Sequence, residues 1–341
     1  VKLTERATGN LTAGIGYSTA EKIILSAGVS QSNIFGTGNA LAFQLSTGQI
    51  NRVASLSYTN PYYTDDGVSR GFDVYSRKVN ASNLDTVGSY NTGTLGGGVR
   101  FGVPITEYDS INYGLAFERT EIELQPTSPI RYREFVAEFG PVSDNYPVTV
   151  GWASDKRDSV IYPTTGSLQR ITAEVGLPLG DLTYYRTNYQ VQWYHPLSKN
   201  LVSYTSGQIG YADGYQGKPL PFYKVFYLGG VNSLRGFQTA SVGPRALNGD
   251  ALGGSHLLLG TGEILFPFPG LEKDKSVRLG WFVDGGMVGE TYDFQELRFS
   301  TGLAFNWYSP VGPLKLSFAR VLNPQPQDRL QRIQFSLGTV F

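Results

Sequence analysis

The chain has 341 residues, and 42 Gly, 22 Tyr and 19 Phe against one Met give it a composition unlike that of helical globular proteins. Lys plus Arg and Asp plus Glu balance at 28 each, and only 16% of residues are charged, which supports neither disorder nor a nucleic-acid-binding surface. With no cysteine, and with His195 and His256 far apart in sequence, we predict no disulfide, no metal site and no cofactor.

The sequence contains no helix that could span a membrane. Its longest stretch without charge, Ile23 to Asn51, is interrupted throughout by Ser, Thr, Gln, Asn and Gly. The N-terminus, Val1 to Arg6, has neither the apolar core nor the cleavage site of a signal peptide. We therefore expect this chain to be a fragment of a longer one.

A two-residue alternation of apolar and small or polar side chains recurs along the chain, in segments of about 8 to 13 residues. That is the length of a tilted strand that crosses a bilayer. In chain order, the clearest early segments are 11–17, 23–29, 41–45, 95–101, 111–117, 185–193 and 277–283. Between Leu297 and Trp307 every odd position is apolar or Thr and every even one is Arg, Ser, Gly, Ala or Asn. The terminal segment repeats this pattern, with Val340 as its exception, and ends on Phe341.

Connections between these segments differ in character along the chain. Six of them carry Pro, Gly, Asn or Asp and are predicted to be periplasmic turns, since barrels keep that side short: 33–38, 60–67, 104–109, 162–166, 196–200 and 309–313. The two longest of the others, 121–146 and 213–253, are then extracellular. Apolar residues from Tyr132 to Phe139 recur at i, i+3, i+4 and i+7, so we expect a short amphipathic helix there and not a strand.

About 16 such segments predict an all-β fold, a transmembrane antiparallel barrel, because bacterial outer-membrane barrels have an even number of strands. A soluble sandwich would also alternate, but a second sheet closes its apolar face. Here the polar face is too rich in Gly and small polar residues to be a charged soluble surface, and aromatic residues gather at strand ends as in an interfacial girdle. The barrel is therefore favoured over the sandwich.

Two motifs carry little weight. Gly67 to Gly71 reads Gly-Val-Ser-Arg-Gly, but it follows an Asp-Asp-Gly turn and enters a strand, whereas a hydrolase serine sits between a strand and a helix. Thr94 to Gly98 lacks the Lys and the helix of a phosphate loop, and glycine also suits inner positions where a loop approaches the wall. We expect no enzyme activity from either.

The longest predicted loop contains Leu228 to Phe237, which reads Leu-Gly-Gly-Val-Asn-Ser-Leu-Arg-Gly-Phe. This segment resembles the Omp85 superfamily, whose members carry an Arg-Gly-Phe/Tyr motif at the tip of the sixth extracellular loop, folded back into the barrel lumen. Further segments resemble the outer-membrane assembly members of that family in the same order and cover nearly the whole chain: 60–67, 162–166, 220–223, the strand around Glu263, 281–286 and 309–314.

The resemblance implies that Arg235, within the loop motif Leu234, Arg235, Gly236 and Phe237, faces two strand carboxylates, Glu263 and Asp284. Alternation places Asp284 on the inner face independently, because Val277, Leu279, Trp281 and Val283 face lipid. Alternation is less clear for Glu263, which shares its face with Leu257, Leu259 and Leu265, but a carboxylate facing lipid is costly. The other interpretation of Arg235 is a solvated loop charge.

The resemblance also implies the domain boundaries and the function. Residues 1–9 are expected to be the exit from a missing periplasmic POTRA domain, and residues 10–341 the barrel. The expected function is the insertion and folding of β-barrel proteins in the bacterial outer membrane, without nucleotide hydrolysis. The implied partners are outer-membrane lipids, unfolded outer-membrane proteins and the accessory lipoproteins of an assembly complex, with no nucleic acid.

A closed barrel has one junction between its first and last strands, expected here between Asn10–Tyr17 and Arg332–Phe341. Gly14 and Gly16 on one side, and Gly338 with Phe341 on the other, predict a weakly paired seam that could template an incoming strand. The glycines could instead serve packing inside the barrel. Two other functions stay open: a translocation or secretion pore of the same superfamily, and a passive porin, although a porin would have opposed charge rows inside.

Overall fold

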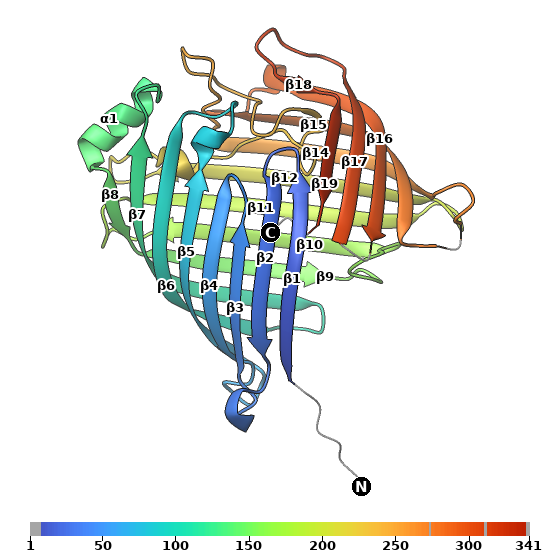
Figure 1. Ribbon diagram of the computed structural model, residues 1–341, viewed down its shortest axis with the longest axis horizontal. Helices are drawn as coiled ribbons and strands as arrows, with labels where there is room; N and C mark the ends of the chain where they lie inside the picture. The colour runs from blue at the N-terminus through green and yellow to red at the C-terminus, as the bar shows by residue number, and fades with distance from the viewer. Residues whose placement is uncertain (1–7, 273, 310–311, 339–341) are drawn as a thin grey trace.

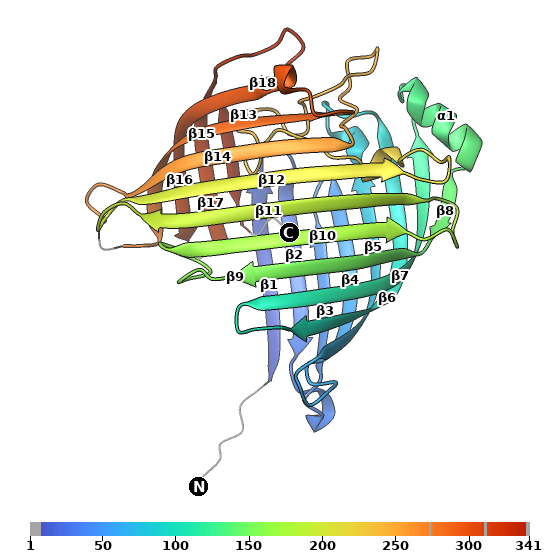
Figure 2. The same ribbon diagram turned by 180° about the vertical axis from the view of Figure 1, so that it is seen from behind.

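The computed structural model describes residues 8–272, 274–309 and 312–338, and it is an antiparallel β-barrel (Figures 1 and 2). Within these residues β8 and β9 both pair with β7 and count as one wall strand, while β13 and β18 form a separate pair, which leaves the predicted 16 strands in the wall. The strands are β1 Gly9–Ser18, β2 Lys22–Gln31, β3 Ala40–Thr47, β4 Asn51–Asn60, β5 Ser69–Asn80, β6 Tyr90–Pro104, β7 Asp109–Leu124, β8 Val142–Asn145, β9 Pro147–Asp155, β10 Gly166–Gly176, β11 Tyr184–Pro196, β12 Val202–Gly214, β13 Gly236–Phe237, β14 His256–Pro267, β15 Val277–Gly289, β16 Arg298–Ser309, β17 Gly312–Val321, β18 Leu330–Gln331 and β19 Ile333–Leu337.

Each wall strand presents alternate residues to opposite faces, as the sequence predicts. On β15, Trp281 and Val283 are 51% and 37% exposed, whereas Phe282 and Asp284 are fully buried. On β16, Leu303 is 54% exposed. Large apolar side chains thus cover the outside of the barrel, which is the arrangement of a barrel solvated by lipid.

Because neighbouring strands are antiparallel, the connections alternate between two ends of the barrel. All six turns predicted to be periplasmic lie at the end where β1 begins, called here the N-terminal end. The opposite end, called the α1 end, holds the two longest connections. The rule of short periplasmic turns fails in the first half of the chain, where connections 19–21 and 48–50 at the α1 end are shorter than 32–39 and 61–68 at the N-terminal end. In that half of the chain, the antiparallel order of the strands, and not the length of the loops, assigns each connection to one end of the barrel.

The predicted amphipathic helix is present as α1, Ile130–Phe139, at the rim (Figure 1). Its apolar face is covered by the long loop, defined here as residues 215–255 between β12 and β14. Phe222 of the 3₁₀ turn Phe222–Lys224 stacks on Tyr132 with ring centroids 4.1 Å apart and meets Phe135 edge-on. Further 3₁₀ turns span Ile34–Gly36, Ala81–Asn83 and Phe294–Glu296. No described helix has the length and apolarity to cross a membrane.

The long loop supplies nearly half of the main buried apolar cluster. Leu228, Leu234 and Phe237 are fully buried, and they belong to one cluster with Leu257 and Leu259 of β14. This packing explains why apolar residues share the inner face of β14 with Glu263. The loop covers them, so they meet side chains instead of water.

Candidate functional site

Arg235 lies at the centre of a buried charge cluster. Its guanidinium donates two hydrogen bonds to Asp284, from Nε to Oδ2 and from Nη2 to Oδ1, each 2.7 Å long. A third, from Nη1, reaches Oε2 of Glu263 at 2.9 Å. Arg235 is 9% exposed, Glu263 6% and Asp284 0%, so the structure brings the three predicted residues together. Bidentate pairing of this kind fixes both the position and the orientation of an arginine.

The loop backbone around Arg235 is held as firmly as its side chain. The Arg235 amide donates to Oδ2 of Asp284 at 3.2 Å, and the guanidinium carbon lies 3.4 Å from the centre of the Phe282 ring. Gly236 has φ +92°, a left-handed value that strains other residues. A side chain at Gly236 would also press on Val321 and Ala319 of β17.

The motif is joined to the last strand of the barrel as well as to β14 and β15. Gln334 of β19, which is fully buried, accepts from the Gly236 amide at 3.2 Å and donates to the Phe237 carbonyl at 2.6 Å. Gly236 and Phe237 also pair in register with Gln331 and Leu330, so β13 and β18 form a small second sheet. Sequence reasoning missed Gln334; its inward parity in a terminal strand is the signal that could have found it.

Glu263 has one oxygen in use and one left over. Its Oε1 is buried and has no hydrogen-bond partner among the described residues. A Cβ at Gly280 would collide with that oxygen, so a side chain there would displace the Glu263 carboxylate. The carboxylate thus lies against the backbone of Gly280 on one side and is hydrogen-bonded to Arg235 on the other.

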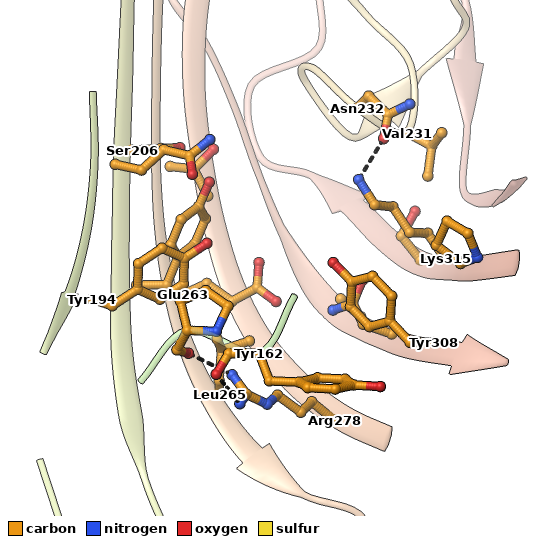
Figure 3. A pocket seen from close by; sticks show the side chains of 18 of the residues that line it. Tyr162, Tyr194, Ser206, Val231, Asn232, Glu263, Leu265, Arg278, Tyr308 and Lys315 are labelled. Carbon is orange, nitrogen blue, oxygen red and sulfur yellow. Dashed lines mark hydrogen bonds between the residues drawn. The ribbon is translucent and has the colours of Figure 1, made fainter. Parts of the chain in front are cut away.

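A cavity of about 440 Å³ adjoins the cluster toward the N-terminal end (Figure 3). Lys315 of β17 projects into it and donates to Asn232 of the long loop at 2.8 Å. Arg278 of β15 donates to the carbonyls of Tyr162 and Pro163, so the turn 156–165 is also tied to the inner wall. The cavity is lined mainly by polar and aromatic side chains, which suits water and polar chains better than apolar ligands.

A second charge cluster, which sequence reasoning missed, fixes the other arm of the long loop. Nζ of Lys224 lies 2.7 Å from Oε1 of Glu174 on β10 and 3.6 Å from Oε2 of Glu118 on β7. Tyr184 donates to Glu174 at 2.5 Å, and Tyr75 donates to Glu118 at 2.6 Å. Burial alone would lower the pKa of Lys224, but the two carboxylates outweigh it and raise that pKa.

The seam is the junction between β1 and β19, which the structure describes as far as Gly338. The described residues register at only two positions, Tyr17 with Leu337 and Ser18 with Ser336, whereas β1 and β2 register along all of β1. The Thr19 amide adds one bond to the Phe335 carbonyl, at 3.1 Å.

Two of the four predicted seam residues meet there. A Cβ at Gly16 would lie 2.8 Å from the Leu337 carbonyl oxygen, and Gly338, with φ +90°, approaches Gly16 equally closely. Gly14 registers with Ser26 of β2, and its place at the seam stays a prediction, because the described residues of β1 and β19 register only at Tyr17 and Ser18. Phe341 lies outside the described residues, as do residues 1–7 of the expected POTRA exit.

A closed 16-stranded barrel with an apolar exterior, whose longest loop places an arginine against two carboxylates of the wall, is a transmembrane β-barrel with an internally held loop. The chain belongs to the Omp85 superfamily, since the model of the Omp85 superfamily domain matches residues 33–341.

Individual relatives agree with this assignment. The chain is 37% identical over 382 residues to the outer membrane protein assembly factor BamA of Neisseria meningitidis, covering 100% of this chain and 48% of that protein. It is 29% identical over 357 residues to the factor of the same name from Nitratidesulfovibrio vulgaris, covering 100% and 43%. The crystal structure of BamA from Haemophilus ducreyi lacking POTRA domains 1–3 matches with a TM-score of 0.93 and 28% identity, over 98% of this chain and 70% of that one. The chain spans about half the length of the two curated relatives.

Proposed function

We propose that this barrel inserts and folds other β-barrel proteins in the bacterial outer membrane by parting the seam between β1 and β19. Relatives with the name of an outer membrane protein assembly factor support the role, and the seam is the observation that carries the mechanism, because its described residues register at two positions only. Parting a junction with few pairings exposes an edge at a lower cost than parting a full ladder.

The exposed edge of β1 would act as a template. Residues 9–16 of β1 pair with β2 on one side and have no registered β19 partner among the described residues on the other. Once the seam is parted, the backbone N–H and C=O groups on that side can accept the strand of a client by β-augmentation. No chemical step is needed, so the proposed role is not enzymatic.

The long loop would hold the rest of the barrel while the seam opens. We propose that it stays inside the lumen, and its contacts with β7, β10, β14 and β15 through Lys224 and Arg235 support this. Gln334 links the loop motif to β19 directly. The loop is thus placed to keep β19 with the wall, leaving β1 as the edge that separates.

The proposed partners follow from the role and from the length of the relatives. They are unfolded outer-membrane proteins, outer-membrane lipids and accessory lipoproteins. Periplasmic POTRA domains would precede the barrel, and β1 begins at the end that carries all six predicted periplasmic turns, which supports that order.

A disulfide across the seam tests the mechanism. Ser18 and Ser336 are directly opposite in register, within reach of a disulfide, and this chain has no cysteine of its own. In the full-length protein, with cysteines elsewhere removed, the oxidised Ser18→Cys/Ser336→Cys variant should remain folded and lose client insertion into liposomes. Reductant should restore it.

The matched control is a disulfide between two strands that do not part. Ala42 of β3 and Ser57 of β4 are opposite in register, and the Ala42→Cys/Ser57→Cys variant should insert clients equally well in both redox states. Undiminished insertion with the seam fully cross-linked would overturn the opening mechanism. Equal ion conductance in both states, with no client insertion in either, would favour a passive pore.

A further inference from the structure

Two cations face each other directly on the outer wall. Arg52 of β4 and Lys78 of β5 are register partners near the α1 end. Both belong to the outward face, because Leu56 on β4 and Phe72 and Val74 on β5 share their parity and are 46%, 46% and 58% exposed. β4 and β5 are neighbours at the front of Figure 1.

Like charges directly opposite in an antiparallel pair destabilise a sheet unless an anion lies between them. Within the described part of the chain, neither Arg52 nor Lys78 makes an ion pair or a side-chain hydrogen bond. Two other outward arginines have partners: Arg119 lies 3.2 Å from Asp144, and Arg70 lies over the ring of Tyr63 at 3.9 Å. The Arg52–Lys78 pair therefore lacks a counter-charge that the same wall supplies elsewhere.

The flanking positions leave room beside the pair. Thr47 of β3 registers with Arg52 and offers a hydroxyl. Gly93 of β6 registers with Lys78, and a side chain at Gly93 would meet no atom within 4 Å. The acid of the same row, Glu121, lies one strand beyond Gly93 and forms no ion pair with Lys78.

In the next row toward the middle of the barrel, the outward side chains are small. The next outward row pairs Ala54 with Ser76, two small residues, and is bordered by Leu45 and Leu95, which are 39% and 59% exposed. Two small side chains between two leucines leave room for an acyl chain to pack against the wall.

The depth of the pair fits a lipid headgroup. From the Arg52 row to the row of Asn60 and Arg70, the strand rises about 26 Å at about 3.3 Å per residue. A strand tilt of about 40° reduces this to about 20 Å across the membrane, close to the apolar band of about 25 Å found in such barrels. The rows between hold Tyr58, Phe72, Leu56 and Val74, so the cations stand at the edge of that band.

We propose that Arg52 and Lys78 bind a phosphate group of a membrane glycolipid in the leaflet at the α1 end, with its acyl chains against Ala54 and Ser76. Arginine and lysine together suit a phosphate, because one presents a planar fork of donors and the other a compact charge. The choice of a glycolipid of the outer leaflet rests on the proposed function, which makes the α1 end extracellular. Binding itself needs no client insertion.

Native mass spectrometry of the full-length protein tests the site with diphosphorylated lipid A as the probe. The Arg52→Gln/Lys78→Gln variant should retain roughly tenfold less lipid A than the wild type, the effect of losing one charged hydrogen bond of about 1.4 kcal/mol. Fully dephosphorylated lipid A should bind both proteins equally weakly. Heat-dependent gel mobility verifies that both are folded.

A lone outward cation provides the matched control. Arg320 of β17 registers with Thr301, is exposed and makes no ion pair among the described residues, so Arg320→Gln should leave lipid A retention unchanged. An equal loss in that variant, or wild-type retention in the double variant, would overturn the site. Phosphatidylglycerol retained as well as lipid A, and lost equally on substitution, would show a general phospholipid headgroup site and overturn the glycolipid assignment. Client insertion is measured separately, so either result leaves the seam mechanism to its own test.

Discussion

The wall formed by β14 and β15 and the seam formed by β1 and β19 close the same barrel by different means. β14 and β15 register over the whole length of β14, and the charge cluster of Arg235, Glu263 and Asp284 reinforces them from inside. The described residues of the seam register at two positions and carry no ion pair. The difference teaches that the long loop reinforces β14 and β15 with charged pairs that the described part of the seam lacks.

The largest effect should come from removing the arginine. Arg235→Ala leaves Glu263 and Asp284 close together and unpaired, and loss of one partner of a buried pair costs about 3 to 5 kcal/mol, reduced by water in the adjoining cavity. Urea unfolding in lipid vesicles measures the change. Arg235→Lys keeps the positive charge but loses the planar pair of donors, so its free energy of unfolding should fall between those of the wild type and Arg235→Ala. A loss below about 1 kcal/mol would mean that the wall does not depend on this cluster.

The next effect concerns the two faces of one strand. Leu303→Arg puts a charge on the lipid face of β16 and should cost about 2 to 4 kcal/mol. The sequence suggests Gly302→Ser as the mild inner substitution, but a side chain at Gly302 would collide with the Phe318 carbonyl, so that choice is wrong. Asn306→Asp is the better control, because Asn306 borders the cavity and registers with Lys315. Equal costs in the same lipid would contradict the assignment of the faces.

A smaller loss is expected at the second cluster. Lys224→Met leaves Glu174 and Glu118 without their cation, and the cost should be about 1 to 3 kcal/mol, since the site is only partly buried. Lys218→Met is the control from the same loop, because the Lys218 side chain makes no ion pair among the described residues and donates only to the Asp181 carbonyl. Similar losses in the two variants would show that Lys224 has no special part in holding the loop.

The smallest effect leaves stability unchanged and appears only in local opening. Amides of β1 that face the seam should exchange hydrogen with solvent faster than amides in the middle of β15, because two registered positions open more readily than a full ladder. Hydrogen exchange of the folded protein measures the difference by mass spectrometry. Equal protection of β1 and β15 would remove the contrast on which the proposed mechanism rests.

Much of the fold was accessible from the sequence because its signals are local. Alternation predicted the lipid faces of β15 and β16, and the spacing from Tyr132 to Phe139 predicted α1. The motif resemblance named Arg235 and its two carboxylates, which meet in the structure, while their role stays a prediction.

What could not be predicted depends on register and on distant neighbours. The offset between β1 and β19, which pairs Tyr17 with Leu337, is fixed by no local pattern. The Lys224 cluster needs a loop residue and side chains of β7 and β10 to meet, and glycine at 302 is required by a carbonyl of the neighbouring strand. Such contacts become visible only when the strands are aligned.

The small sheet of β13 and β18 has a mechanical consequence. It joins the loop motif to the connection that leads into β19. Three residues after Gln331, the side chain of Gln334 bonds to the same two motif residues, Gly236 and Phe237. A force that pulls β19 out of the wall would therefore also have to break contacts with Gly236 and Phe237, which directly follow Arg235. The last strand of the barrel is therefore anchored from inside the lumen, on the side of the seam that β19 forms.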